Sequence, residues 1–118
     1  LEERGVGFVA VSPLANGLLS NRYTAETTFD PTTDYRASMP QFRRESFERN
    51  RTLFELVEGL AEEHRATPSQ IALAWLLGQK QNLAILVGAR TPEEFRQDAA
   101  AFTIDLSEKE CAWLNLEC

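Results

Sequence analysis

The sequence predicts an α/β fold in which two parallel strands and about four helices form one domain over residues 1–118. Two short apolar runs, at residues 7–12 and 83–88, are typical of buried strands. Helix-capping signals follow at residues 67, 91 and 107. The resulting order is strand, long loop, two helices, strand, two helices, which is typical of βα units with parallel strands. No second domain is expected.

The first strand is expected at residues 7–12. Its apolar residues are continuous rather than alternating, which predicts burial on both faces. Ser12 and Pro13 end this strand and open a loop that contains Gly17. Strand exits of this kind are where α/β proteins build ligand sites, although the same residues can simply end a strand.

Residues from about 20 to 41 are expected to form a long loop, because threonine and proline recur along them. The segment exceeds the usual length of a connection inside a compact domain. Such loops are either functional lids or disordered segments.

A long amphipathic helix is expected over residues 41–64, where apolar residues recur at spacings of three and four. Thr67, Thr91 and Ser107 each begin a capping box, in which the hydroxyl accepts from a free backbone N–H and a Gln or Glu side chain three residues later reaches back. The helix after Thr67 is apolar nearly all round, which predicts packing on several sides.

Eighteen acidic and twelve basic residues give a net charge of -6, which argues against binding to nucleic acid or to an anionic membrane surface. The arginines at positions 43–51 alternate with Glu45 and Glu48, a pattern typical of a solvated helix face. No apolar run approaches the ~20 residues that span a bilayer. No signal-peptide pattern precedes the first strand, so we expect a cytoplasmic protein. With His64 as its only histidine, the chain is expected to hold no metal.

Several sequence blocks, taken together, resemble the aldo-keto reductase family. They are residues 5–14 (GVGFVAVSPL), 67–75 (TPSQIALAW), 87–90 (VGAR) and 95–98 (FRQD). Residues 34–36 (DYR) and 40–42 (PQF) resemble the family's bacterial branch. The resemblance covers essentially the whole chain. It implies a partial (β/α)8 TIM barrel, in which this chain corresponds to the C-terminal third, with barrel strands seven and eight and their following helices.

The resemblance also implies an enzyme that reduces the carbonyl group of a small aldehyde or ketone with NADP(H). In TIM barrels the loops after strands seven and eight frequently form the phosphate site. By resemblance the first loop meets the pyrophosphate and ribose, and the second loop and its helix meet the 2′-phosphate and adenine. The implied cofactor-binding residues are Ser12, Pro13, Leu14, Asn16, Gly17, Leu19, Gly88, Ala89, Arg90, Glu94, Gln97 and Asp98.

The family's catalytic Asp, Tyr, Lys and His lie on earlier strands, and nothing in this chain matches them. No catalytic residue is therefore assigned, and we expect the segment to be inactive by itself. Val11 stands where the family has an aromatic residue, and Ala89 where it has Ser or Thr. Glu94 and Asp98 replace uncharged or basic residues, and each carboxylate near a 2′-phosphate costs on the order of a kcal/mol. These departures predict weak cofactor binding by the segment alone.

The alternative hypothesis is a non-enzymatic barrel remnant that acts as a self-association module. Two strands cannot cover their own edges. Pairing between copies would bury those edges and give a homo-oligomer.

Overall fold

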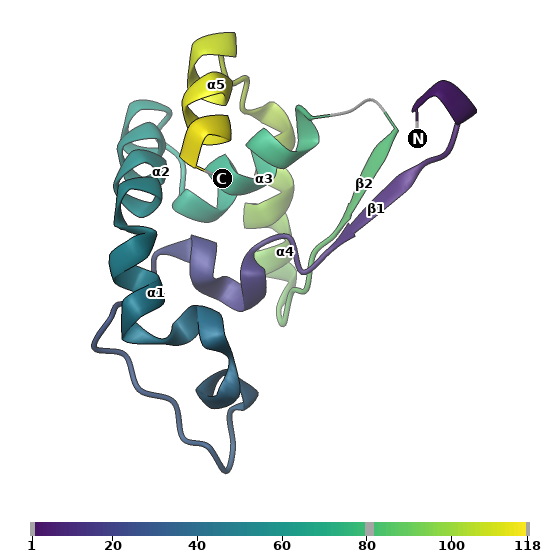
Figure 1. The fold of residues 1–118 in the computed structure, drawn as a ribbon. Helices are drawn as coiled ribbons and strands as arrows, with labels where there is room; N and C mark the ends of the chain where they lie inside the picture. Colours follow the sequence, from purple (N-terminus) through teal and green to yellow (C-terminus); the bar gives the residue numbers. More distant parts are fainter. Residues whose placement is uncertain (1, 80–81, 118) are drawn as a thin grey trace.

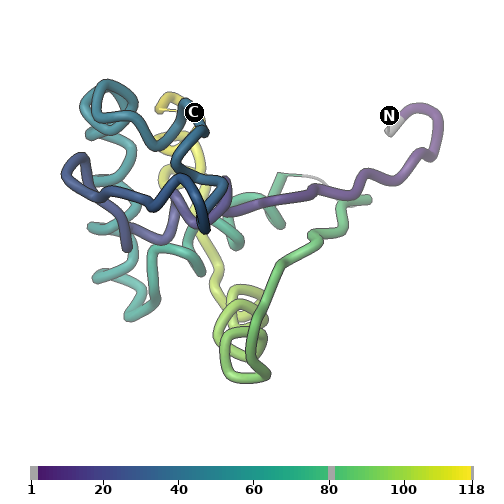
Figure 2. Tube along the Cα trace, turned by 90° about the horizontal axis from the view of Figure 1, so that it is seen from below, coloured from purple at the N-terminus to yellow at the C-terminus, as the bar shows by residue number. Residues whose placement is uncertain are grey.

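A computed structural model describes residues 2–79 and 82–117. Strands β1 (Phe8–Val11) and β2 (Leu83–Leu86) pair in parallel, with Phe8 opposite Leu83 and Val11 opposite Leu86. The strand pair extends away from the helical part of the molecule (Figures 1 and 2). The α-helices in the described residues are α1 (Arg44–Arg49), α2 (Arg51–Glu63), α3 (Pro68–Leu77), α4 (Pro92–Ala99) and α5 (Glu108–Glu117). Short 3-10 turns are η1 (Glu2–Arg4), η2 (Ala15–Ser20), η3 (Tyr35–Ser38), η4 (Pro40–Phe42) and η5 (Ala100–Thr103).

The prediction of two parallel strands is confirmed, but the predicted burial of the first strand on both faces is wrong. In β1 only Ala10 is buried, while Val9 and Val11 are 57% and 68% exposed. Burial on both faces requires strands on either side and a covering layer of helices. In the described part of the chain each strand has a single neighbour, so its remaining edge and much of its apolar surface stay uncovered.

The single helix expected over residues 41–64 is also a wrong prediction, because η4, α1 and α2 divide that segment. Asn50 separates α1 from α2, and both its backbone N–H and its side-chain amide donate to the carbonyl of Ser46. The Ser46 carbonyl thus accepts both the regular helical bond and the side-chain bond, and Asn50 itself, with φ of −96° and ψ of 11°, leaves the helical conformation. The periodic apolar pattern continues across this break, which explains why periodicity alone does not detect it.

Two of the three predicted capping boxes form completely. The Thr67 hydroxyl accepts from the N–H of Gln70 and the Gln70 side chain accepts from the N–H of Thr67. Ser107 and Glu110 make the same reciprocal pair. At Thr91 only the hydroxyl bond forms, because the Glu94 carboxylate accepts from the N–H of Arg90 instead, at 2.7 Å.

The main core lies between α2, α3 and α5. It contains Val57, Leu60, Ala61, Ile71 and Leu114. Burial of the consecutive residues 71–74 confirms that α3 packs on several sides. No helix in the described ranges is long and apolar enough to cross a membrane.

A second, aromatic core organises the long loop. The rings of Tyr23, Phe29 and Phe42 meet edge to face at centroid separations of 5.1–5.7 Å, and Phe47 of α1 lies next to Phe42. Edge-to-face pairs of this kind add about 0.5–1.5 kcal/mol each beyond their buried area. The loop is therefore a packed part of the fold, which neither its length nor its polar composition predicts.

A short hydrogen bond joins the start of α5 to His64, the residue that follows α2. One carboxylate oxygen of Glu110 lies 2.6 Å from His64 Nε2, and the other accepts from the N–H of Ser107 at 2.6 Å. Hydrogen bonding with the Ser107 side chain, then with His64 and then with the Ser107 N–H, lowers the pKa of Glu110 to about 2. The ionised carboxylate thus stabilises the folded state.

Replacing Glu110 with Gln is expected to lower the free energy of unfolding by about 1 kcal/mol at pH 7, because a hydrogen-bonded charge is lost. A carboxyl group whose pKa is lowered on folding stabilises the fold above its unfolded pKa of about 4.5, and this contribution is lost as pH falls toward 2. The difference in the free energy of unfolding between wild type and Glu110→Gln, measured by urea unfolding at pH 7, 5 and 3, should therefore shrink as the pH falls. Glu108→Gln, an exposed position in the same first turn, is the matched control, and an equal loss there would contradict the assignment.

Candidate cofactor-binding cleft

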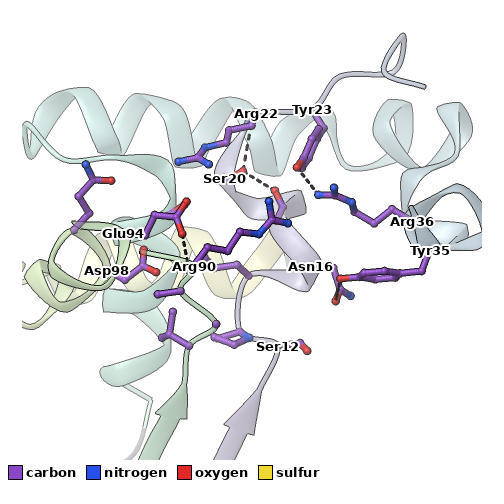
Figure 3. A pocket seen from close by; sticks show the side chains of 18 residues that line it. Ser12, Asn16, Ser20, Arg22, Tyr23, Tyr35, Arg36, Arg90, Glu94 and Asp98 are labelled. Carbon is purple, nitrogen blue, oxygen red and sulfur yellow. Dashed lines mark hydrogen bonds between the residues drawn. The ribbon is translucent and has the colours of Figure 1, made fainter. Parts of the chain in front are cut away.

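The carboxyl ends of β1 and β2 open into a cleft of about 420 Å³ (Figure 3). One wall is the loop after β1, and the facing wall is the loop after β2 together with α4. Ser69 at the start of α3 and residues from the long loop complete the lining. Parallel pairing makes this arrangement possible, because it places both strand exits at the same edge of the sheet.

The structure brings eleven of the twelve sequence-predicted site residues to this one cleft. Leu19 is the exception; it lies in η2, where its N–H donates to the carbonyl of Leu14. The eleven that line the cleft are Ser12, Pro13, Leu14, Asn16, Gly17, Gly88, Ala89, Arg90, Glu94, Gln97 and Asp98.

The loop after β1 is held in an unusual backbone conformation. Ser12, Ala15 and Asn16 have φ between 49° and 61°, and Gly17 has φ of 93°. Left-handed conformations are costly for residues with a Cβ and persist where the surrounding structure fixes them, often at ligand sites. Here the N–H of Ala15 donates to the carbonyl of Ser12, and that of Gly17 to the carbonyl of Leu14, so the turn is closed by its own hydrogen bonds.

Asn21, just after η2, takes up the same left-handed conformation with φ of 52°. Asparagine tolerates this region better than other residues with a side chain. Its side-chain amide donates to the carbonyl of Phe54 at 3.2 Å, which ties the end of η2 to α2. Asn21 therefore forms the turn and also links it to α2 through a side-chain hydrogen bond.

The α4 wall is fixed from two sides. Glu94 accepts from the N–H of Arg90, which holds the loop after β2 against the first turn of α4. The Gln70 side chain donates to the carbonyl of Gln97 at 2.6 Å while its oxygen caps Thr67. The α3 capping box thus also holds the C-terminal half of α4 beside the cleft.

Sequence reasoning missed seven lining residues, including two cations. They are Ser20, Arg22, Tyr23, Tyr35, Arg36, Ser69 and Val87. The family resemblance at residues 34–36 includes Tyr35 and Arg36, but it did not assign them to a site. The aromatic core of the long loop, a non-local contact that has no sequence signature, holds Tyr23 and Arg36 at the cleft.

Arg36 is held tightly at the edge of the cleft. Its guanidinium donates to Asp34 at 2.5 Å and to the Tyr23 hydroxyl, and lies about 5 Å from the ring centroids of Tyr23 and Phe29. The hydrogen bond from Arg36 is the main cause that lowers the pKa of Asp34. The charge of Arg36 is therefore already offset within the protein.

The opposite side of the cleft is acidic. Figure 3 shows Glu94 and Asp98 together, with Arg22 pointing toward them and Arg90 extending toward the centre. Burial raises the pKa of Asp98, and the neighbouring Glu94 raises it further while Arg22 opposes the shift. Arg22 is thus a nearby cation that opposes the charge of Glu94 at Asp98.

Two parallel strands whose carboxyl ends open into a loop-and-helix cleft define a piece of a (β/α) barrel. The chain matches the aldo/keto reductase family over residues 1–115, and it belongs to that family. It is 35% identical over 108 residues to "Probable aldo-keto reductase 1" of Glycine max, covering 92% of this chain and 31% of that protein. It is 34% identical over 110 residues to "Aldo-keto reductase str7" of Strobilurus tenacellus, covering 93% and 32%.

Solved structures give the same result. The glycerol dehydrogenase AKR11B4 from Gluconobacter oxydans superposes with a TM-score of 0.86 at 27% identity, over 98% of this chain and 35% of that one. The thermostable aldo-keto reductase Tm1743, solved with the inhibitor epalrestat, gives a TM-score of 0.68 at 28% identity, over 98% and 31%. The chain spans about a third of the length of these relatives. The family resemblance and the partial-barrel fold are thereby confirmed.

Replacing Gly17 with Ala is expected to lower the free energy of unfolding by about 1–2 kcal/mol, because φ is 93° there and the new Cβ would lie 3.2 Å from the Tyr23 ring. Gly59→Ala is the control, because it should change the free energy of unfolding in the opposite direction. Gly59 lies inside α2 with nothing within 4 Å of an added Cβ, so alanine should stabilise by about 0.5–1 kcal/mol. Thermal unfolding measures both variants. Equal stability of Gly17→Ala and wild type would show that the turn is not constrained as described.

Proposed function

We propose that this chain is the C-terminal, cofactor-binding part of an NAD(P)H-dependent aldo-keto reductase that reduces small aldehydes or ketones. The observation that carries the proposal is the convergence of the two strand-exit loops and α4 on one cleft that three arginines line. The arginines, among the described residues, are Arg22, Arg36 and Arg90.

The chemistry of the cleft suits the phosphate groups of a dinucleotide, and the resemblance assigns the pyrophosphate to the loop after β1 and the 2′-phosphate to the loop after β2, which carries Arg90. Arg90 and Arg22 offer guanidinium groups, whose planar donors match phosphate oxygens. The N-terminus of α4 adds backbone N–H groups and the positive end of a helix dipole. Ser12 and Asn16 supply a hydroxyl and an amide that can bind ribose hydroxyls.

When bound, the nicotinamide cofactor supplies the hydride that reduces the carbonyl carbon of the substrate. The proposed role of this chain is to bind the cofactor and to orient it. Val11, at the end of β1, offers apolar contact without an aromatic stacking face. The Tyr23 hydroxyl accepts from Arg36, and the Tyr35 hydroxyl lies 3.4 Å from Asn16 Oδ1, so both phenols have positioning partners. We assign the proton donor to a part of the enzyme that this chain does not carry.

A second candidate function is self-association through the strand pair. The observation that favours it is the cluster of exposed apolar side chains on two strands that each have one partner in the described chain. These side chains are Phe8, Val9, Val11 and Leu86. A second copy could extend the sheet and bury them.

The purified 118-residue chain is expected to consume no reduced cofactor above background with an aromatic aldehyde, followed by the absorbance of the reduced nicotinamide. Binding is the second readout, by calorimetry with NADH and NADPH. Arg90→Ala should weaken dinucleotide binding about tenfold, because a charged hydrogen-bonding group is lost. Arg96→Ala is the control, because Arg96 pairs with Glu93 outside the cleft. Steady turnover would refute inactivity, and equal binding by Arg90→Ala would refute its placement at the phosphates.

Self-association predicts a dimer or larger species in light scattering at micromolar concentrations. Val9→Lys should convert it to monomer, because a charge on the uncovered strand opposes pairing. Leu116→Lys, at an exposed position of α5, should leave the assembly intact. A wild-type chain that stays monomeric would remove this candidate.

A further inference from the structure

Helix α4 forms one wall of the cleft, yet none of its side chains is buried. Apolar packing therefore contributes little to fixing its position, and a helix of this kind opens easily unless polar contacts hold it. The bond from the N–H of Arg90 to Glu94 ties its first turn to the preceding loop. That bond joins residues four positions apart, so it cannot set the position of α4 against the rest of the fold.

A side chain of α3 makes the longer-range connection. Gln70 Nε2 donates to the carbonyl of Gln97 at 2.6 Å, across 27 positions of the sequence. The same carbonyl also accepts from the N–H of Ala100, in the last turn of α4, where helix carbonyls need partners from outside the helix. Helices α3 and α4 are in contact (Figure 1), and in the described part of the chain this is the side-chain hydrogen bond that joins them.

The amide of Gln70 is oriented before it reaches α4. Its Oε1 accepts from the N–H of Thr67 at 2.9 Å, within the capping box of α3. Because the oxygen is used there, the amide nitrogen is left to donate to α4. The next residue, Ile71, is fully buried in the main core. Gln70 therefore connects α4 to the packed part of the fold.

This hydrogen bond lies at the corner of the cleft where α3 and α4 meet. Ser69, the residue before Gln70, lines the cleft, and so do Gln97 and Asp98. Gln70 itself is not a lining residue. Any effect that it has on a ligand must therefore act through the position of α4.

Resting on the proposed function, we propose that Gln70 is a positioning residue for cofactor binding, which holds the α4 wall in the place that the ligand requires. The capping sequence at residues 67–70 thus has a second role besides starting α3. Without the bond, α4 populates displaced positions, and the apparent dissociation constant rises as the fraction of competent molecules falls. One neutral hydrogen bond shifts such an equilibrium by about fivefold.

Two variants remove the amide donor in different ways. Gln70→Glu keeps an oxygen that can accept from the Thr67 N–H, as Glu does in other capping boxes, but its carboxylate has no N–H for Gln97. Gln70→Met removes both bonds and adds no charge. Thr67→Ala is the matched control, because it removes the cap hydroxyl and leaves both bonds of the Gln70 side chain in place.

The first readout is calorimetric titration of the 118-residue chain with NADH and NADPH. Both Gln70 variants should bind about fivefold more weakly, and Gln70→Met should lose the same factor for each dinucleotide. Thr67→Ala should change either affinity by less than about twofold, although its thermal midpoint falls by about 4 °C. Gln70→Glu should melt within about 2 °C of wild type, because its cap remains. If Gln70 only stabilised α3, affinity would instead follow the thermal midpoint.

The second readout, amide hydrogen exchange, needs no ligand. The N–H groups of residues 96–99 should exchange about fivefold faster in both Gln70 variants than in wild type or Thr67→Ala. Added salt should leave the binding defect of Gln70→Glu in place, because a lost hydrogen bond is not screened as a charge effect is.

Wild-type affinity in both Gln70 variants, with dinucleotide bound by wild type, would overturn the positioning role alone. Unchanged exchange in α4 would overturn it as well. Binding of neither dinucleotide to wild type would overturn the proposed function and the positioning role together.

Discussion

The parallel pairing of two four-residue strands decides where the two strand-exit loops of the candidate site lie. Phe8 opposite Leu83 sets a register in which β1 and β2 end level with one another. Their exit loops, far apart in the sequence, therefore meet at one edge and enclose the cleft. A shift by one residue would turn each side chain to the other face and move the loops apart. Yet Ala10 is the one residue of β1 that is buried, so the pair makes little core of its own.

The helices supply the stability that the strands lack. The core between α2, α3 and α5 is made of aliphatic side chains, and α3 also contacts α4, η5 and β2. Gln70 joins this core to the cleft, because its side chain caps α3 and holds the carbonyl of Gln97. The aromatic core of the long loop holds the other side of the cleft, because Arg36 lies against the rings of Tyr23 and Phe29. The site is thus positioned by two separate packed regions.

Local signals account for what could be predicted from the sequence. The Thr67 cap, the apolar strands and the strand-exit loop each depend on residues within a few positions of one another. The site residues came from the family resemblance, and eleven of them line the cleft. The break at Asn50 was missed because the apolar pattern continues across it, while the backbone of that single residue leaves the helical conformation. Arg22 and Arg36 were missed because aromatic contacts between distant residues bring them to the cleft. Strand exposure depends on what lies beyond each strand edge, which a strand's own residues do not encode.

The structural roles of Glu94 do not account for its negative charge. Its carboxylate accepts from the N–H of Arg90 and lies in the first turn of α4, where a negative side chain complements the helix dipole. A glutamine oxygen could make the same hydrogen bond, so the bond alone does not require an anion. The dipole contributes about 0.3–1 kcal/mol, and Glu93 in the same turn already provides a negative charge for it. The Glu94 charge therefore exceeds what the fold needs, and it lines the cleft near Asp98.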